Sequence, residues 1–213
     1  MKKNLIVVIT LMLAWLCAAT THAQLLMKKN YEGRQDASYY LKGAVPEQGG
    51  KVVFTKVISV PGKSKQDLFY AVGQWAELRY QANTARGEWY EPNAFRNLDY
   101  SRVQTADIDD GIITCQGDEE IVFVNKVLNR DATRMQYVLR LNFTDGQVQV
   151  EMSQIVYTYT LVEEAERIAA EDWITDREAM NKKGRLLKAS ARFRVRTIDL
   201  KDELFKEIEE AAR

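Results

Sequence analysis

The sequence predicts an α+β fold in which helices cover one face of an antiparallel sheet. Three observations support this: a β-branched run at 51–60, alternating apolar and polar residues with short turns across 111–161, and helical spacing on either side of that region. The expected order is strand, helix, four-strand meander, long helix. We expect a single domain at 51–200, preceded by a partly ordered leader segment at 24–50 and followed by a short exposed C-terminal helix at 201–213.

The first two elements are well delimited. The run Lys51–Val60 is rich in β-branched residues, as expected for a strand with a buried face, and Pro61-Gly62 ends it. Ser64 followed three residues later by Asp67 resembles a capping box. Apolar residues then recur at helical spacing, which predicts a helix over 65–81; they are Leu68, Phe69, Val72, Trp75 and Ala76.

An aromatic loop is predicted at 82–107. It contains Trp89, Tyr90, Phe95 and Tyr100. These rings either pin the loop to the domain, which is the preferred interpretation, or bind a sugar ring or a protein partner. Trp89 and Tyr90 are therefore candidate partner-binding residues.

The meander is predicted from short turns between apolar segments. Its four strands are expected at 111–116, 119–127, 134–144 and 147–161. They would be joined by a turn at Gly117-Asp118, a polar link at 129–133 and a turn at Asp145-Gly146. Alternation in the last two strands predicts one buried sheet face and one wetter face.

The C-terminal region is predicted to cover the buried face. Thr175 and Glu178 form a second capping-box pattern, followed by a helical apolar stripe. The members of that stripe are Met180, Gly184, Leu187, Ala191, Val195 and Ile198. Beyond it, Leu204, Phe205 and Ile208 lie among acids and predict the short exposed helix.

The same region carries a basic stripe. Arg185, Lys188, Arg192 and Arg196 are spaced by three or four residues. The preferred interpretation is a solvated helix face, and the alternative is a surface that meets an anionic glycan, a lipid headgroup or an acidic partner. These four residues are the remaining candidate partner-binding residues.

Residues 1–23 have the pattern of a signal peptide, with cleavage between Ala23 and Gln24. The protein is therefore expected to be exported and to be periplasmic or extracellular. A lipoprotein through Cys17 is disfavoured, because the bulky Trp15 and Leu16 precede it. No later segment is long enough to span a membrane.

Cleavage would restrict the available chemistry. It removes His22, the only histidine, and leaves Cys115 as the only cysteine, in a segment that reads as a buried strand. The usual base for a serine or cysteine nucleophile and the commonest zinc ligand would then be missing. No catalytic residue, metal ligand or cofactor site is assigned, and the sequence favours a protein that is not an enzyme.

The acidic segments have ordinary interpretations. Asp107–Gly111 is interpreted as a turn, because its spacing does not match a calcium loop. The pairs at Glu119-Glu120, Glu163-Glu164 and Glu171-Asp172 are interpreted as solvated surface acids. Because the chain has formal charge +0, attraction to nucleic acid is not expected.

Several strings occur in the same order as in an exported bacterial family. They are Tyr40-Leu41-Lys42-Gly43-Ala44-Val45-Pro46, Gly50-Lys51-Val52-Val53-Phe54-Thr55-Lys56, Pro61-Gly62-Lys63-Ser64, Gly117-Asp118-Glu119 with Ile121-Val122-Phe123, and Glu171-Asp172-Trp173-Ile174-Thr175-Asp176. The chain resembles the family called domain of unknown function 4468, which has a fold like that of the TATA-binding protein. The resemblance implies that fold and export, and it transfers no catalytic residues.

Two functional hypotheses follow. The first is a non-catalytic binding or scaffolding module of the cell envelope, with a glycan or an envelope protein as its partner. The alternative is a carboxylate-dependent hydrolase acting on a polysaccharide, which needs two acids brought together from distant segments.

Overall fold

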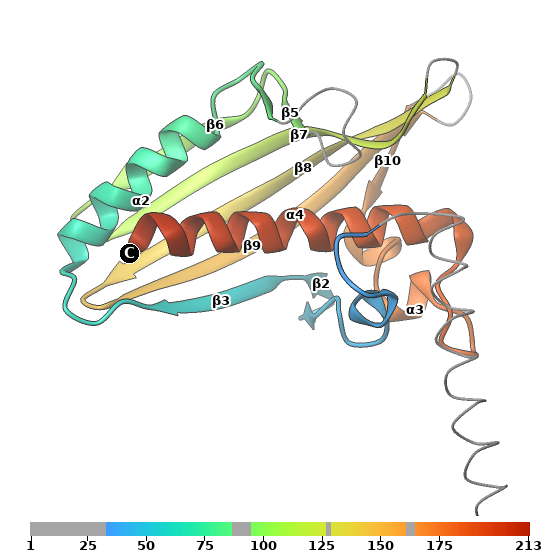
Figure 1. The fold of residues 1–213 in the computed structure, drawn as a ribbon, viewed down its shortest axis with the longest axis horizontal. Helices are drawn as coiled ribbons and strands as arrows, with labels where there is room; N and C mark the ends of the chain where they lie inside the picture. The colour runs from blue at the N-terminus through green and yellow to red at the C-terminus, as the bar shows by residue number, and fades with distance from the viewer. Residues whose placement is uncertain (1–32, 87–94, 127–128, 161–164) are drawn as a thin grey trace, which may run out of the picture.

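An antiparallel sheet forms one layer and two helices form the other (Figure 1). The computed structural model describes residues 33–86, 95–126, 129–160 and 165–213. Within them the main sheet has eight strands in the order β10-β9-β8-β7-β5-β4, with β3 on β9 and β6 on β7. The predicted α+β fold with helices on one face is confirmed. The shorter strands are β3 (Phe54–Ser59), β4 (Ala85–Arg86), β5 (Phe95–Asn97), β6 (Arg102–Asp107) and β10 (Ala165–Ala169).

Helix α2 (Lys65–Arg79) follows the first strand as predicted. Ser64 accepts a hydrogen bond from the Asp67 backbone, and Asp67 returns the contact, so the capping box is present. Leu68, Val72 and Ala76 are fully buried towards the sheet. The helix ends slightly before the predicted Gln81.

The predicted turn at Gly117-Asp118 is wrong, because one strand, β7 (Ile112–Lys126), runs straight through it. Gly117 pairs with Tyr137 on the next strand, and a Cβ at Gly117 would lie 2.2 Å from the Tyr137 ring. Asp118 is buried and bonds Arg134 at 2.6 Å. The glycine therefore makes room for a ring from the neighbouring strand and does not reverse the chain.

Three long strands replace the expected four. Strand β8 spans Asn129–Thr144, so the predicted polar link at 129–133 is also strand. Strand β9 spans Gln147–Thr160, and the turn at Asp145-Gly146 is confirmed.

The long helix begins later and ends later than predicted. Thr175 caps only the short α3 (Asp176–Ala179), and the chain then turns at Gly184, whose φ is +72°. Helix α4 runs from Lys188 to Ala212 and crosses the strands (Figure 1). The prediction of a separate, short and exposed C-terminal helix is wrong. Helix α4 is continuous across the expected boundary at residue 200, and it buries the apolar residues beyond that boundary. These are Leu204, Phe205, Ile208 and Ala212.

Part of the leader segment belongs to the folded unit. Residues 33–50 include η1 (Ala37–Tyr40) and the hairpin of β1 (Glu47–Gln48) with β2 (Lys51–Val52). Tyr40 is fully buried, and its hydroxyl donates to Asp199 of α4 at 2.5 Å. The folded unit therefore begins before residue 51.

Candidate ligand-binding site on the open sheet face

The helix-free face of the sheet carries a hollow of about 720 Å³. Side chains alternate along the strands, so Cys115, Tyr137 and Met152 lie in the core and their neighbours lie on the open face. The polar residues that line the hollow come from five segments of the chain. They are Gln48, Lys51, Gln116, Gln136, Glu151, Ser153, Gln154, Arg167 and Glu171.

Two irregularities lie at the hollow. The pairing of β8 with β9 shifts register between Gln136 and Val138, and Gln154 adopts a φ of +54°. Such a bulge bends a strand and increases its local twist. Gln136, Val138 and Gln154 all line the hollow, which is therefore built where the pairing of β8 and β9 is irregular.

Basic and acidic side chains line the hollow in equal number. Lys51 forms an ion pair with Glu171, whose side chain is only 15% exposed. Ser153 donates to Glu151 at 3.3 Å, whereas Arg167 forms no ion pair with the residues that the structure describes. Two cations and two anions therefore line a surface otherwise made of amides, a hydroxyl and aliphatic groups.

The ion pair with Lys51 favours the ionised form of Glu171. Partial burial acts to raise its pKa, but the hydrogen bond and charge of Lys51 outweigh burial, so the pKa of Glu171 is lowered. The carboxyl group is therefore ionised at neutral pH and suited to accept hydrogen bonds.

The predicted basic stripe does not form one exposed face. Arg185 precedes α4 and is exposed, as is Lys188. Arg192 is half-buried against Asp131, and Arg196 is only 2% exposed. The prediction of a continuous basic face is wrong, because the apolar surface of α4 is wide enough to bury these positions.

Arg194, beside that stripe, has a structural role. Its guanidinium donates to the carbonyls of Tyr40, Leu41 and Ile174 and to Asp176, at 2.6–2.7 Å. It thereby connects the leader segment and α3 to α4.

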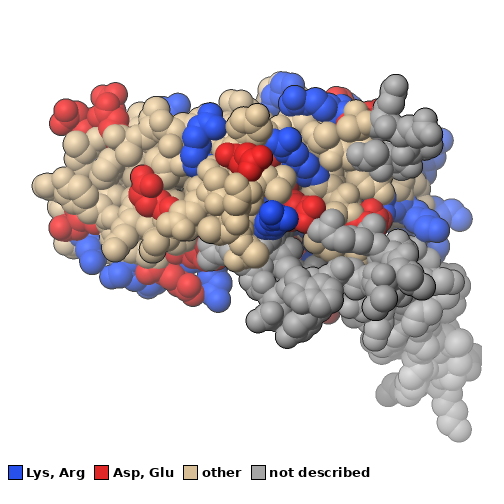
Figure 2. Space-filling model, turned by 90° about the horizontal axis from the view of Figure 1, so that it is seen from above, with Lys and Arg blue, Asp and Glu red and all other residues tan. Residues whose placement is uncertain are grey.

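Over the described part of the face in Figure 2, basic and acidic side chains are intermixed.

The other candidates have mixed outcomes. Trp89 and Tyr90, like the expected cleavage site at Ala23 and Gln24, lie outside the described residues. Tyr100, from the same aromatic loop, is exposed beneath the Arg134 guanidinium, 5.3 Å from its ring centroid.

The cysteine and the acidic turn are confirmed. Cys115 is fully buried, and burial raises its pKa to about 12, so the thiol is unreactive at neutral pH. Asp107 accepts hydrogen bonds from the backbones of Asp109 and Asp110, and Gly111 has a φ of +65°. The segment is a turn.

The interpretation of Glu119 as a surface acid is wrong. Glu119 is fully buried and bonds Arg79 of α2 at 3.0 Å, and Tyr137 donates to it at 2.5 Å. Among the residues that the structure describes, three or more His, Cys, Asp or Glu nowhere converge as a metal site. In that same part of the chain, no helix has the length and apolarity that crossing a bilayer requires.

The hollow is not evident from the sequence. Alternation predicted a wetter sheet face, but the lining comes from segments that lie far apart in the chain. The available signal was a glutamine next to a core residue on each of two strands, Gln116 beside Cys115 and Gln136 beside Tyr137.

The family model described as "Domain of unknown function (DUF4468) with TBP-like fold" matches residues 54–158. A crystal structure of a DUF4468 family protein from Bacteroides ovatus is 33% identical, with a TM-score of 0.72. The alignment covers 84% of this chain and 96% of that one. The chain belongs to the DUF4468 family. No curated protein matches it.

A second solved structure shares the fold with this DUF4468 protein. It is a TBP-like protein from Parabacteroides distasonis, 23% identical, with a TM-score of 0.60. The alignment covers 79% of this chain and 96% of that one. The first comparison supports the predicted family and fold, the second supports the fold, and neither assigns an activity.

Proposed function

We propose that this DUF4468 protein is a non-catalytic binding module of the cell envelope, and that the hollow on its open sheet face holds a neutral glycan. The observation that carries the proposal is the lining itself. Amides, carboxylates and a hydroxyl from β7, β8, β9, the β1–β2 hairpin and the segment at Glu171 converge on one volume of about 720 Å³. That volume lies in the roughly 300–1,000 Å³ range of small-ligand sites.

The chemistry of the lining favours a neutral polar ligand. Lys51 and Arg167 are matched by Glu151 and Glu171, so the hollow does not select for net charge. Glutamine amides can donate and accept, whereas ionised carboxylates only accept. This mixture suits sugar hydroxyl groups, which also do both. The envelope location rests on the signal-peptide pattern at residues 1–23.

The hydrolase remains a second candidate because Glu151 and Glu171 line the same hollow from distant segments. A glycosidase needs one of its two carboxyl groups protonated, which requires a raised pKa. The pKa of Glu171 is lowered through Lys51, which is the opposite direction. Glu171 therefore does not suit the role of the general acid, and a hydrolase would have to use Glu151 in that role.

A glycan array probed with the purified protein tests the proposal. Gln136→Ala and Glu151→Ala should lose the signals of the wild-type protein. Gln149→Ala is the matched control, because Gln149 is exposed on the same face of β9 but outside the hollow. Equal array signals from all variants, or no glycan bound by the wild-type protein, would refute the proposal. New reducing ends in a bound glycan would instead favour the hydrolase.

A further inference from the structure

The turn that joins α3 to α4 carries four exposed cations. Figure 1 shows this connection at the end of α4 that lies opposite the C-terminus. Within the described ranges none of the four forms an ion pair; they are Lys182, Lys183, Arg185 and Lys188. The acids nearest in sequence already have partners. Asp176 pairs with Arg194, and Glu178 pairs with Arg177. The turn therefore has a net positive charge.

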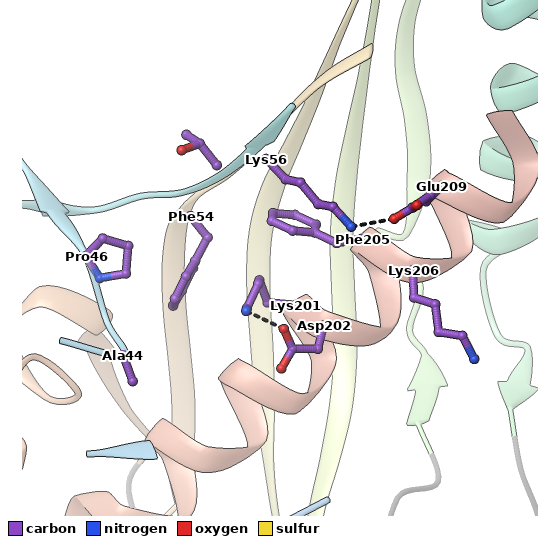
Figure 3. A pocket seen from close by; sticks show the side chains of 10 residues that line it. Ala44, Pro46, Phe54, Lys56, Lys201, Asp202, Phe205, Lys206 and Glu209 are labelled. Carbon is purple, nitrogen blue, oxygen red and sulfur yellow. Dashed lines mark hydrogen bonds and ion pairs between the residues drawn. The ribbon is translucent and has the colours of Figure 1, made fainter. Parts of the chain in front are cut away.

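The lysines in the C-terminal half of α4 differ, because each has an acidic partner. Lys201 pairs with Asp202, as Figure 3 shows, and Lys206 lies 3.5 Å from Glu210. In residues 181–213, all of which the structure describes, exposed cations without an acidic partner are therefore found only at the N-terminal end of α4 and in the turn before it.

Hydrogen bonds fix the shape of the turn. The Gly184 backbone donates to the carbonyl of Asn181 at 2.9 Å. The Asn181 side chain accepts from the backbones of Lys183 and Arg185, at 2.9 and 3.1 Å. Lys182 and Lys183 are the central residues of this four-residue turn, so they lie at its tip. Their ammonium groups are therefore presented on a convex surface.

The start of α4 has unfilled hydrogen-bonding capacity. Leu187 gives no side-chain cap, and the first turn holds no acid. The N–H groups there have no acceptor among the described residues; they belong to Lys188, Ala189 and Ser190. The Ser190 hydroxyl is also without a partner, although the residue is only 3% exposed, and helical side chains tilt towards the N-terminus. Lys188 adds positive charge at the positive end of the helix dipole, so a bound anion would be stabilising.

An exposed leucine lies among these cations. Leu187 is 41% exposed and stands between Arg185 and Lys188. An apolar side chain flanked by basic ones is typical of surfaces that bind the membrane interface. There the cations contact lipid phosphates, and the apolar group enters the boundary with the acyl chains.

We propose that the turn at 181–188 binds the surface of a membrane that contains anionic phospholipid. The four cations contact lipid phosphates, the open N–H groups of α4 donate to one phosphate, and Leu187 enters the acyl boundary. A flat bilayer can meet all of these groups on a convex turn, whereas a peptide ligand needs a groove or a sheet edge. Export, expected from residues 1–23, would bring the turn beside such membranes. The proposal is independent of the hollow and its glycan.

Cosedimentation with lipid vesicles measures this binding. The protein is purified as residues 24–213, so that the apolar residues 5–19 do not contribute. It should sediment with phosphatidylcholine vesicles that contain about one-third phosphatidylglycerol, and high salt should release it. It should not sediment with pure phosphatidylcholine. Equal sedimentation with both kinds of vesicle, or with neither, would overturn the proposal.

Two double variants test whether the turn carries the binding. Lys182→Gln/Lys183→Gln should weaken it roughly 25-fold, because each cation near an anionic surface contributes about fivefold. Lys206→Gln/Arg213→Gln makes the same change in net charge at exposed positions near the other end of α4, and it should bind like wild type. Leu187→Ala should weaken binding without changing its salt dependence. Wild-type binding by the first variant, or an equal loss in the second, would refute the assignment.

Two competitors distinguish a membrane from other anionic ligands. At constant ionic strength, neither inorganic phosphate nor polyglutamate should displace the protein from the vesicles. Displacement by phosphate would assign the turn to a free phosphate compound. Displacement by polyglutamate, lost in Lys182→Gln/Lys183→Gln, would assign it to an acidic protein partner. Either result would overturn the membrane proposal.

Discussion

Arg79 of α2 and Glu119 of β7 form an ion pair in which neither side chain is exposed to solvent. The guanidinium contacts both carboxylate oxygens, at 3.0 and 3.1 Å. The Asn97 side chain accepts a further bond from Arg79. The helix is thereby fixed to the sheet by a polar contact inside an apolar core.

Removal of either member of this pair should destabilise the protein strongly. Glu119→Ala removes the buried anion of Arg79 and leaves only the partly exposed Glu207, 3.6 Å from the Arg79 Nε. The expected loss in unfolding free energy is about 3–5 kcal/mol. Urea denaturation measures it. Arg79→Leu/Glu119→Leu should recover most of the loss, because both charges are removed together.

The matched control is the exposed pair of Lys206 and Glu210, 3.5 Å apart. Glu210→Ala should change the unfolding free energy by less than about 0.5 kcal/mol. A Glu119→Ala protein as stable as Glu210→Ala would contradict this account of the pair.

Gly117→Ala should destabilise the sheet. Its new Cβ would overlap the Tyr137 ring, which is fixed by the hydrogen bond to Glu119, and overpacking of this kind costs roughly 1–3 kcal/mol. Gly73→Ala in α2 is the control, since its Cβ would meet only Ile113, at 3.4 Å. That change should stabilise the protein by roughly 0.5–1 kcal/mol. Thermal melting compares the two, and a stable Gly117→Ala would disprove the close approach.

Asp199 should give stability a specific pH dependence. Burial raises its pKa, although the hydrogen bond from Tyr40 opposes the shift. Because the folded state favours the protonated form, the contribution of Asp199 is greatest below its ordinary pKa of about 4 and is lost as pH rises through the raised value. Asp199→Asn should therefore gain stability relative to wild type as the pH rises through that window. Urea titrations at a series of pH values test this, and a constant difference would contradict it.

Deletion of residues 204–213 should prevent folding. It removes Leu204, Phe205 and Ile208, each almost completely buried. At about 1.5–3 kcal/mol per side chain, the loss is comparable to the whole stability of a typical domain. Deletion of Arg213 alone should have little effect. Circular dichroism during thermal unfolding of both proteins measures whether each is folded. A cooperatively folded 1–203 chain would show that the C-terminal end of α4 is dispensable.

The sequence predicted the fold class because period-two and helical patterns are local properties. Ser64 and Asp67 located the start of α2 correctly. The prediction of a turn at Gly117-Asp118 was wrong because glycine and aspartate are typical of turns. Their presence does not reveal that the Tyr137 ring on the next strand occupies the space where a Cβ of residue 117 would lie. Thr175 is a true cap, but the helix that it caps is short, and Leu187 begins α4 without a side-chain cap.

The candidate sites were harder to predict than the elements. Arg192 and Arg196 belong to the predicted basic stripe, yet in α4 Arg192 is half-buried and Arg196 is almost completely buried. The hollow depends on the register shift near Gln136 and on the positive φ of Gln154, which are tertiary features. Nothing local to Glu151 or Glu171 indicates that they line the same volume.

An NMR titration of the ¹⁵N-labelled protein with an oligosaccharide selected on the array tests the ligand site most directly. The account predicts that amide shifts concentrate around the hollow, at Gln116, Gln136, Ser153 and the β1–β2 hairpin, while α4 stays unchanged. Shifts confined to α4, or no shifts at saturating oligosaccharide, would contradict it.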